Sequence, residues 1–148
     1  MDKESYISLE IRKLSILIKR IVDNNIAKNN FDVPSGIQSW VLRYLYKNRD
    51  KDIFQRNIEK QFSIRRSSTT SMLQCMEKRG LIMRQGVDYD ARLKKITLTP
   101  KAIKAVDTIE KEILEVGGLI TKDLTEEEIK SFNHVISKII KNLSDFDK

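Results

Sequence analysis

Residues 53–99 read IFQRNIEKQFSIRRSSTTSMLQCMEKRGLIMRQGVDYDARLKKITLT, and this stretch decides the fold. Two short helices are predicted in it, over about residues 54–62 and 66–79, joined by a turn too short for any other element. At the spacing of a packed helix, the inward face of the second helix is predicted to consist of Thr69, Met72, Leu73 and Met76. The pattern is that of a helix–turn–helix.

A short β-hairpin is predicted to follow the second helix. Gly80 stands where a helix end favours a residue that tolerates positive φ. Two strands are expected over residues 81–84 and 93–98, with residues 86–92 forming a loop longer than a tight turn. The predicted fold class is therefore mainly α with a small β-hairpin wing, a winged helix–turn–helix flanked by helices at both ends.

The positive charge of the chain is concentrated in the same region. Residues 54–104 contain 12 Lys and Arg against 4 Asp and Glu, whereas the net charge of the whole chain is only +7. A local basic field beside a helix–turn–helix indicates a protein that binds nucleic acid, and double-stranded DNA is the expected partner.

The rest of the composition excludes several classes of protein. No apolar run approaches the roughly 18–20 residues that a membrane span needs, so no membrane association is expected. The single cysteine, Cys75, cannot form an internal disulfide, which favours a reducing compartment and a cytoplasmic protein. We expect Cys75 to be a packed residue, and a redox-active thiol stays open as the alternative. His134 has no Cys or His cluster beside it, and no catalytic set or Gly-rich phosphate loop is present, so neither an enzyme, a cofactor nor a metal is expected.

Helices are predicted on both sides of the basic region. Ser35 is the expected N-cap of a helix whose inner face is predicted to consist of Ile37, Trp40, Val41, Tyr44 and Leu45. Thr99 and Pro100 open a long helix, which is predicted to end at the Gly117-Gly118 pair. A capping box at Thr125-Glu126-Glu127-Glu128 then opens the last helix.

The terminal helices carry broad apolar stripes that a domain of this size cannot bury alone. Such stripes are expected at the seam of a homodimer. The predicted interface residues are Ile7, Ile11, Leu14, Ile136, Ile139 and Leu143. We divide the chain into an N-terminal dimerisation helix (residues 1–32), a winged helix–turn–helix domain (33–99) and C-terminal helices that complete the dimerisation region (100–148).

The order and spacing of these motifs resemble the MarR family of bacterial transcription regulators. The matching stretches are residues 64–73 and 76–84, the Asp90-Ala91-Arg92 element of the wing, and Leu98-Thr99 leading into the long helix. The resemblance covers nearly the whole chain, with the flanking helices where the family has its dimerisation helices. It implies a homodimeric regulator, which we expect to be a repressor acting on a pseudo-palindromic operator.

The residue types on the second helix and the wing are suited to DNA. Short hydroxyls and an amide can approach base edges, and arginines can contact phosphates or enter a minor groove. The resemblance implies that Asp90 orients the wing by pairing with basic groups. The predicted DNA-binding residues are Arg65, Arg66, Ser67, Ser68, Thr70, Ser71, Gln74, Asp90, Arg92 and Lys94.

The resemblance also implies a cleft for a small effector, often aromatic or phenolic. Its candidate residues are Ile11, Leu14, Trp40 and Tyr44, although the spacing of Trp40 alone favours core packing. The alternative function is a winged-helix module that binds an acidic protein partner. That function would favour apolar or aromatic residues on the outer face of residues 66–79, where the sequence has Ser, Thr, Gln and Arg.

Overall fold

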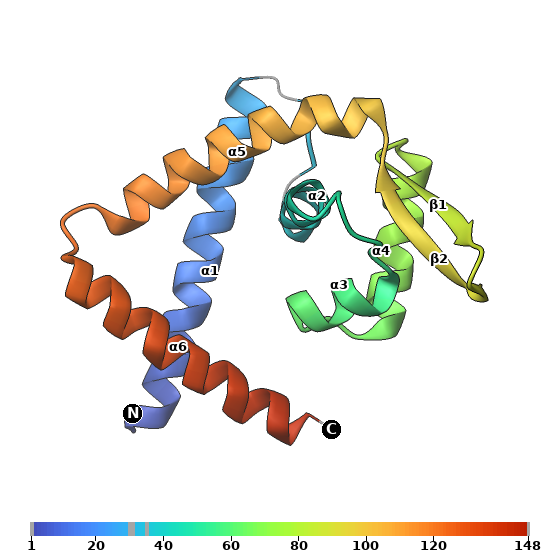
Figure 1. Ribbon diagram of the computed structural model, residues 1–148. Helices are drawn as coiled ribbons and strands as arrows, with labels where there is room; N and C mark the ends of the chain where they lie inside the picture. The colour runs from blue at the N-terminus through green and yellow to red at the C-terminus, as the bar shows by residue number, and fades with distance from the viewer. Residues whose placement is uncertain (1, 30–31, 35, 148) are drawn as a thin grey trace. The chain divides into compact units, whose positions relative to one another are not determined.

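The computed structural model describes residues 2–29, 32–34 and 36–147, apart from the side chains of residues 4 and 5, and its elements are labelled in Figure 1. The helices are α1 (Lys3–Lys28), α2 (Ile37–Lys47), α3 (Gln55–Phe62), α4 (Arg66–Lys78), α5 (Pro100–Thr121) and α6 (Glu126–Phe146), and the strands are β1 (Ile82–Val87) and β2 (Asp90–Leu98). The predicted fold class is confirmed. The chain forms two units, residues 1–116 and 117–148, which are described separately.

The core of the first unit lies where α2, α3, α4, the hairpin and the first part of α5 meet. Each of these elements contributes apolar side chains that are almost completely buried, among them Leu42, Ile58, Leu73, Met76, Leu81, Ile82, Ile96, Val106 and Ile109. We call the part from α2 to β2 (residues 37–98) the head. Because one continuous core joins its elements, the head holds α4 in a fixed orientation.

The helix–turn–helix is formed by α3 and α4, within one residue of the predicted bounds. Ser63 takes up a left-handed conformation with φ 51°, and the Ile64 amide donates to the carbonyl oxygen of Glu59 at 3.0 Å. Gly80 follows α4 with φ 70°, as its position after the helix predicts. The inward face is confirmed as well, with Thr69, Leu73 and Met76 buried and Met72 half-buried.

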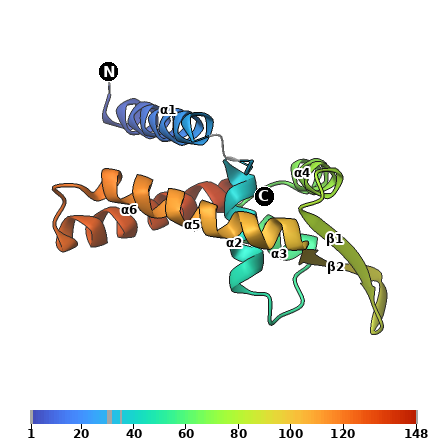
Figure 2. The same cartoon turned by 90° about the horizontal axis from the view of Figure 1, so that it is seen from above.

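The hairpin has longer strands and a shorter turn than predicted. The antiparallel ladder continues past Gly86, so that only Asp88 and Tyr89 remain between the strands. Gly86 lies opposite Lys94 and Val87 lies opposite Asp90, which leaves residues 91–93 as a bulge on β2. The prediction of a loop over residues 86–92 is therefore wrong, because an extra segment on one strand interrupts the alternation without ending the pairing. Figure 2 shows the hairpin projecting from the helices of the first unit.

The prediction for the inner face of α2 is right for Val41 and Leu45, which are buried, and for Tyr44, which is half-buried, but wrong for Ile37 and Trp40. Its buried residues are Val41, Leu42 and Leu45, whereas Ile37 and Trp40 are exposed and the Arg43 guanidinium lies 5.7 Å from the centre of the Trp40 ring. The core contacts come from a stripe centred on Leu45, on the side of the helix away from Trp40. The N-cap is Gly36, while Ser35, the predicted cap, lies outside the described residues.

The long helix α5 starts as predicted and ends later. The Ala102 amide donates to Thr99 Oγ1 at 3.2 Å, which confirms Thr99 as the N-cap. The helix then passes through Gly117 and Gly118 to Thr121, so the predicted end is wrong. Glycine inside a helix costs only about 1 kcal/mol, and the Thr121 hydroxyl donates to the Gly117 carbonyl across this turn at 2.9 Å.

The last helix, α6, is the main element of the second unit. The predicted capping box is confirmed, since the Glu128 amide donates to Thr125 Oγ1 and the Thr125 amide donates to Glu128 Oε2. None of the residues of α6 is buried in the single chain. No helix in the described part of the chain is long and apolar enough to cross a membrane.

Candidate nucleic-acid interface

The outer face of α4 is polar and open, while its inner face is buried in the core. The exposed residues at its start and along this face are Arg65, Arg66, Ser67, Ser68, Ser71 and Gln74. Helices rich in serine and threonine have weak intrinsic stability, so α4 depends on its buried face to stay folded. Packing of the inner face therefore leaves the hydrogen-bonding side chains of the outer face of α4 exposed.

Thr70 differs from the other predicted residues of this face because its hydroxyl is already occupied. It is half-buried, its Oγ1 donates to the Arg66 carbonyl at 2.9 Å, and Gln55 Nε2 donates to it at 2.8 Å. These bonds join the first turn of α3 to α4. We therefore assign Thr70 to holding the two helices together.

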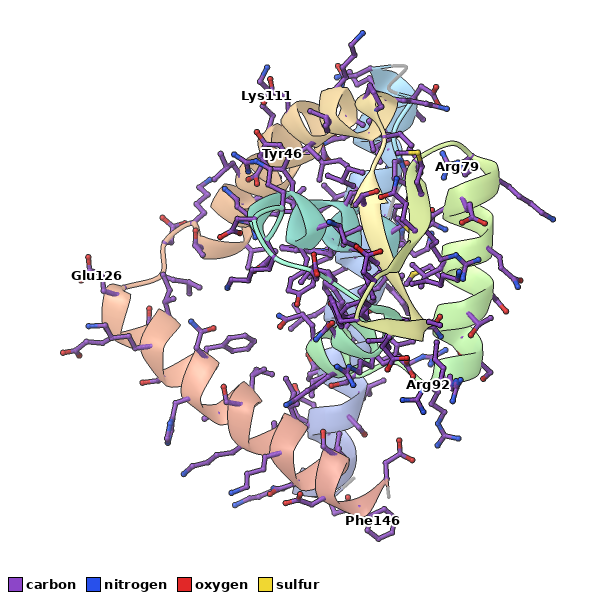
Figure 3. All side chains as sticks on the ribbon, turned by 45° about the vertical axis from the view of Figure 1, so that its right-hand side comes forward. Tyr46, Arg79, Arg92, Lys111, Glu126 and Phe146 are labelled. Atoms are coloured by element: carbon purple, nitrogen blue, oxygen red, sulfur yellow. The ribbon has the colours of Figure 1, made fainter. Side chains whose placement is uncertain are left out.

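The wing presents Arg92 beside a carboxylate that fixes its direction. Asp90 Oδ1 accepts from the Arg92 amide at 2.9 Å and from Arg92 Nε at 3.2 Å, and Asp90 Oδ2 accepts from Nη2 at 3.1 Å. The Arg92 side chain remains 89% exposed, and Figure 3 shows it at the turn end of the hairpin. Asp90 thus pairs with a basic group of the wing, as the resemblance implied, and holds the arginine outward.

Three further contacts, none of them predicted, attach the wing to the segment between α2 and α3 and to α4. Asp52 Oδ2 accepts from the Tyr89 hydroxyl at 2.9 Å, and Asp52 Oδ1 lies 3.3 Å from Lys95 Nζ. At the base of the hairpin, Arg84 Nε and Nη2 donate to the two carboxylate oxygens of Glu77 on α4, at 3.0 and 3.4 Å. The wing is therefore attached at both ends.

Residues 33–93 match the sequence model of the MarR family, and this segment contains the helix–turn–helix and most of the wing. The solved structure of the MepR–DNA complex from S. aureus is similar over 96% of this chain and 99% of that chain, with a TM-score of 0.82 and 24% identity. Residues 33–93 of the chain therefore resemble the MarR family, and the likeness in fold to solved MarR-family regulators extends over nearly the whole chain. Members of this family are transcription regulators and not enzymes, and the chain has their DNA-binding winged-helix fold.

Other solved structures show the same fold. The transcription regulator MarR from Oenococcus oeni PSU-1 is 26% identical, with a TM-score of 0.72, over 95% of this chain and 99% of that chain. The heme sensor protein PefR, solved with heme and carbon monoxide, is 22% identical, with a TM-score of 0.65, over 97% of this chain and 95% of that chain. The similarity to each of these proteins thus extends beyond the head to the flanking helices of the chain.

The contacts of the wing shift the pKa of three carboxyl groups. The hydrogen bond from Tyr89 and then that from Lys95 lower the pKa of Asp52, the bond from Arg84 lowers the pKa of Glu77, and the bonds from Arg92 lower the pKa of Asp90. Burial and the bond to Asp52 raise the pKa of Tyr89. Because the folded pKa values of the carboxyl groups are depressed, their stabilisation is complete above the ordinary values of 3.8 and 4.5 and is lost as the pH falls through the folded values.

We expect a carboxyl titration by NMR to show these shifts. In the folded protein, Asp52 and Asp90 should titrate below 3.8 and Glu77 below 4.5. In Tyr89→Phe the midpoint of Asp52 should rise towards 3.8, because its largest hydrogen bond is gone, while that of Glu77 should not move. An unchanged Asp52 midpoint in Tyr89→Phe would contradict the bond between Tyr89 and Asp52.

Cys75 is exposed on α4, so the expectation of a packed cysteine is wrong. Gln38 Nε2 lies 3.9 Å from its sulfur, and Gln38 Oε1 accepts from Arg79 Nη1 at 3.3 Å. The buried face of α4 passes through Leu73 and Met76 and leaves Cys75 beside the exposed Gln74. A redox role for this thiol stays an untested alternative.

The four candidate effector residues have different environments. Ile11, Leu14 and Trp40 are exposed, with Trp40 45% accessible, while Tyr44 is half-buried and contacts Phe62 edge-on at 5.8 Å between ring centres. A cavity of about 450 Å³ in the first unit has none of these four in its lining, which consists of Asp32, Val33, Pro100, Lys101, Lys104, Ala105 and Thr108. Core packing for Trp40 is thus wrong, and an effector site at these four residues stays a prediction.

The predicted interface residues are accessible in the single chain. On α1, Ile7, Ile11 and Leu14 are exposed; on α6, Leu143 is exposed and Ile136 and Ile139 are half-buried. Within the first unit, Asn25 Nδ2 donates to the buried carboxylate of Glu112 on α5 at 3.1 Å, so one polar bond joins α1 to α5. The apolar side chains themselves are left open.

Proposed function

We propose that the protein is a homodimeric transcription regulator, acting as a repressor, that binds a pseudo-palindromic DNA operator in a sequence-specific manner. The observation that carries this proposal is the exposed face of hydroxyls, amide and arginine on α4, next to a wing whose Arg92 is held outward by Asp90. Both surfaces belong to one rigid head. Double-stranded DNA is the partner that fits both surfaces, because its grooves expose base edges to hydroxyls and amides and its phosphates attract arginines.

The side chains divide into those that specify sequence and those that position the protein. Ser67, Ser68, Ser71 and Gln74 face the major groove, where hydroxyls and amides hydrogen-bond to base edges. Arg65 and Arg66 lie at the start of α4, where they contact phosphates. The wing places Arg92 in the flanking minor groove, with Lys94 near its phosphates.

The two-fold arrangement follows from the open apolar stripes of α1 and α6. Covering them with a second copy removes large apolar side chains from water and gives a self-complementary interface. Two heads then face successive major grooves, about 10–10.5 base pairs apart. An operator with two-fold symmetry matches this arrangement.

Release by a small aromatic or phenolic effector is the regulatory part of the proposal. The structure of PefR with heme supports the idea that proteins of this fold bind small molecules. An effector beside Trp40 and Tyr44 would change the separation of the two heads and weaken DNA binding. Trp40 is the only tryptophan of the chain, so its fluorescence reports such binding directly.

Selection of bound duplexes from a random pool tests the proposed function. The wild-type protein should enrich a motif with two-fold symmetry. Ser71→Ala should relax the preference at one base pair in each half-site, whereas Arg92→Ala should weaken binding to all selected duplexes about tenfold. Enrichment of no sequence would end the regulator hypothesis and favour an acidic protein partner.

A further inference from the structure

We propose that Asp52 and Tyr89 are positioning residues that hold the wing in the conformation in which Arg92 reaches DNA. The proposal rests on the proposed function, because it assumes that the wing contacts DNA. It adds a segment outside the helix–turn–helix and the hairpin, residues 52–54 between α2 and α3, which we call the strap. Neither Asp52 nor Tyr89 is assigned a role in DNA contact.

The carboxylate of Asp52 connects two separate points of the hairpin. Its Oδ2 accepts from the Tyr89 hydroxyl in the turn at 2.9 Å, and its Oδ1 pairs with Lys95 Nζ on β2 at 3.3 Å. One carboxylate therefore uses both oxygens on the wing. Hydrogen bonds to a charged acceptor are the stronger kind, and two of them from different places restrict both position and rotation.

The rest of the strap adds backbone and aromatic contacts to the same hairpin. The Ile96 amide of β2 donates to the Ile53 carbonyl at 2.8 Å, so the strap extends the ladder by one bond. The Phe54 ring meets the Tyr89 ring edge-on, with 6.5 Å between ring centres. Ile53 and Phe54 are themselves buried, so the strap is anchored in the core on its other side.

Arg92 lies midway between the two points that Asp52 holds. Tyr89 precedes it by three residues and Lys95 follows it by three residues, and between them residues 91–93 bulge out of the ladder. A bulge lacks the pairing that would otherwise fix its backbone. Holding both of its ends restricts it before DNA arrives, so less conformational entropy is lost on binding.

Whether removal of Asp52 weakens or strengthens DNA binding distinguishes a positioning role from a simple effect of its charge. Asp52 carries a negative charge beside the wing, which the proposed function places against a polyanion. If charge alone mattered, its removal would strengthen DNA binding. Positioning predicts the opposite, because removal of Asp52 frees the wing.

The test compares Asp52→Ala, Tyr89→Phe and the double variant on a duplex selected by the wild-type protein. Each single variant should weaken binding about threefold, and the double variant should be no weaker than the singles, whereas independent contributions would multiply to about ninefold. Asp52→Asn should recover part of the affinity, because its carboxamide oxygen still accepts from Tyr89 while the ion pair with Lys95 is lost. The matched control is Asp50→Ala, which removes an exposed charge two residues earlier and should leave affinity unchanged or raise it.

Three results would overturn the proposal. Weaker binding by Tyr89→Phe with unchanged binding by Asp52→Ala would mean that the Tyr89 hydroxyl contacts DNA directly. Wild-type affinity in both single variants, or a ninefold loss in the double variant, would mean that the two residues do not act as one contact. Tighter binding by Asp52→Ala, matching that of Asp50→Ala, would mean that Asp52 affects DNA binding only through its negative charge.

Failure of the proposed function is recognised separately, because the wild-type protein would then bind no duplex. The strap is in that case judged in the free protein by NMR order parameters of residues 90–93. A decrease in Asp52→Ala and in Tyr89→Phe, with none in Asp50→Ala, would show that the strap holds the wing. Unchanged order parameters would overturn the proposal without any DNA measurement.

Discussion

Leu143→Asp is expected to weaken self-association about a thousandfold and thereby to abolish tight binding to a duplex with two half-sites. Leu143 is 65% exposed in the single chain and lies on the apolar stripe of α6. In a two-fold interface the substitution occurs twice, so a loss of about 2 kcal/mol for each leucine gives about 4 kcal/mol for the dimer. Sedimentation velocity over a range of concentrations measures the change.

The matched control is His134→Asp, which introduces the same carboxylate into the same helix. Nine residues separate the two positions, so they project from opposite sides of α6. His134→Asp should remain dimeric and bind DNA nearly as well as the wild-type protein. Equal dissociation of the two variants would mean that the added charge, and not its place on the apolar stripe, disrupts the dimer. If both variants remained dimeric, the proposed interface would be contradicted.

Leu73→Ala is expected to lower the free energy of unfolding by about 3 kcal/mol. Leu73 is completely buried on the inner face of α4, within the core of the head. Truncating a buried leucine removes apolar contacts and leaves a cavity that the neighbouring residues fill only in part. Because α4 depends on packing for its helical structure, the same change should also reduce DNA affinity.

Urea denaturation followed by circular dichroism measures this effect, with protein concentration held constant because association adds to apparent stability. Ser71→Ala is the control on the opposite face of the same helix. Ser71 is exposed, so its truncation should change stability by less than about 0.5 kcal/mol. Comparable destabilisation by the two substitutions would contradict the assignment of inner and outer faces.

Local sequence patterns predicted those parts of the fold that depend on local interactions. The apolar spacing at Leu73 and Met76, the glycine after α4 and the cap at Thr99 each depend on residues within about one turn. The polar outer face of α4 was predicted for the same reason, since burial of one face determines the other. The pairing of Asp90 with Arg92, two residues apart, came from the resemblance and is also local.

The features that were missed depend on contacts between segments distant in sequence. Asp52 and Tyr89 are 37 residues apart, and nothing in the polar stretch around Asp52 indicates that its carboxylate meets the wing. Gln55 and Thr70 are 15 residues apart, so the occupied hydroxyl of Thr70 could not be recognised from an amphipathic pattern. For Trp40, the pattern indicated an apolar face and could not specify which part of it the core would cover.

The salt dependence of binding to the selected duplex tests the central claim most directly. If two heads place Arg65, Arg66 and Lys94 against phosphates and Arg92 in the flanking minor groove, the logarithm of the association constant should fall linearly with the logarithm of salt concentration. Between about 50 and 200 mM salt, the account predicts a loss of on the order of a thousandfold or more. An affinity that changes by less than about twofold over this range would contradict it, because the basic surface of α4 and the wing would then not be in contact with the DNA backbone.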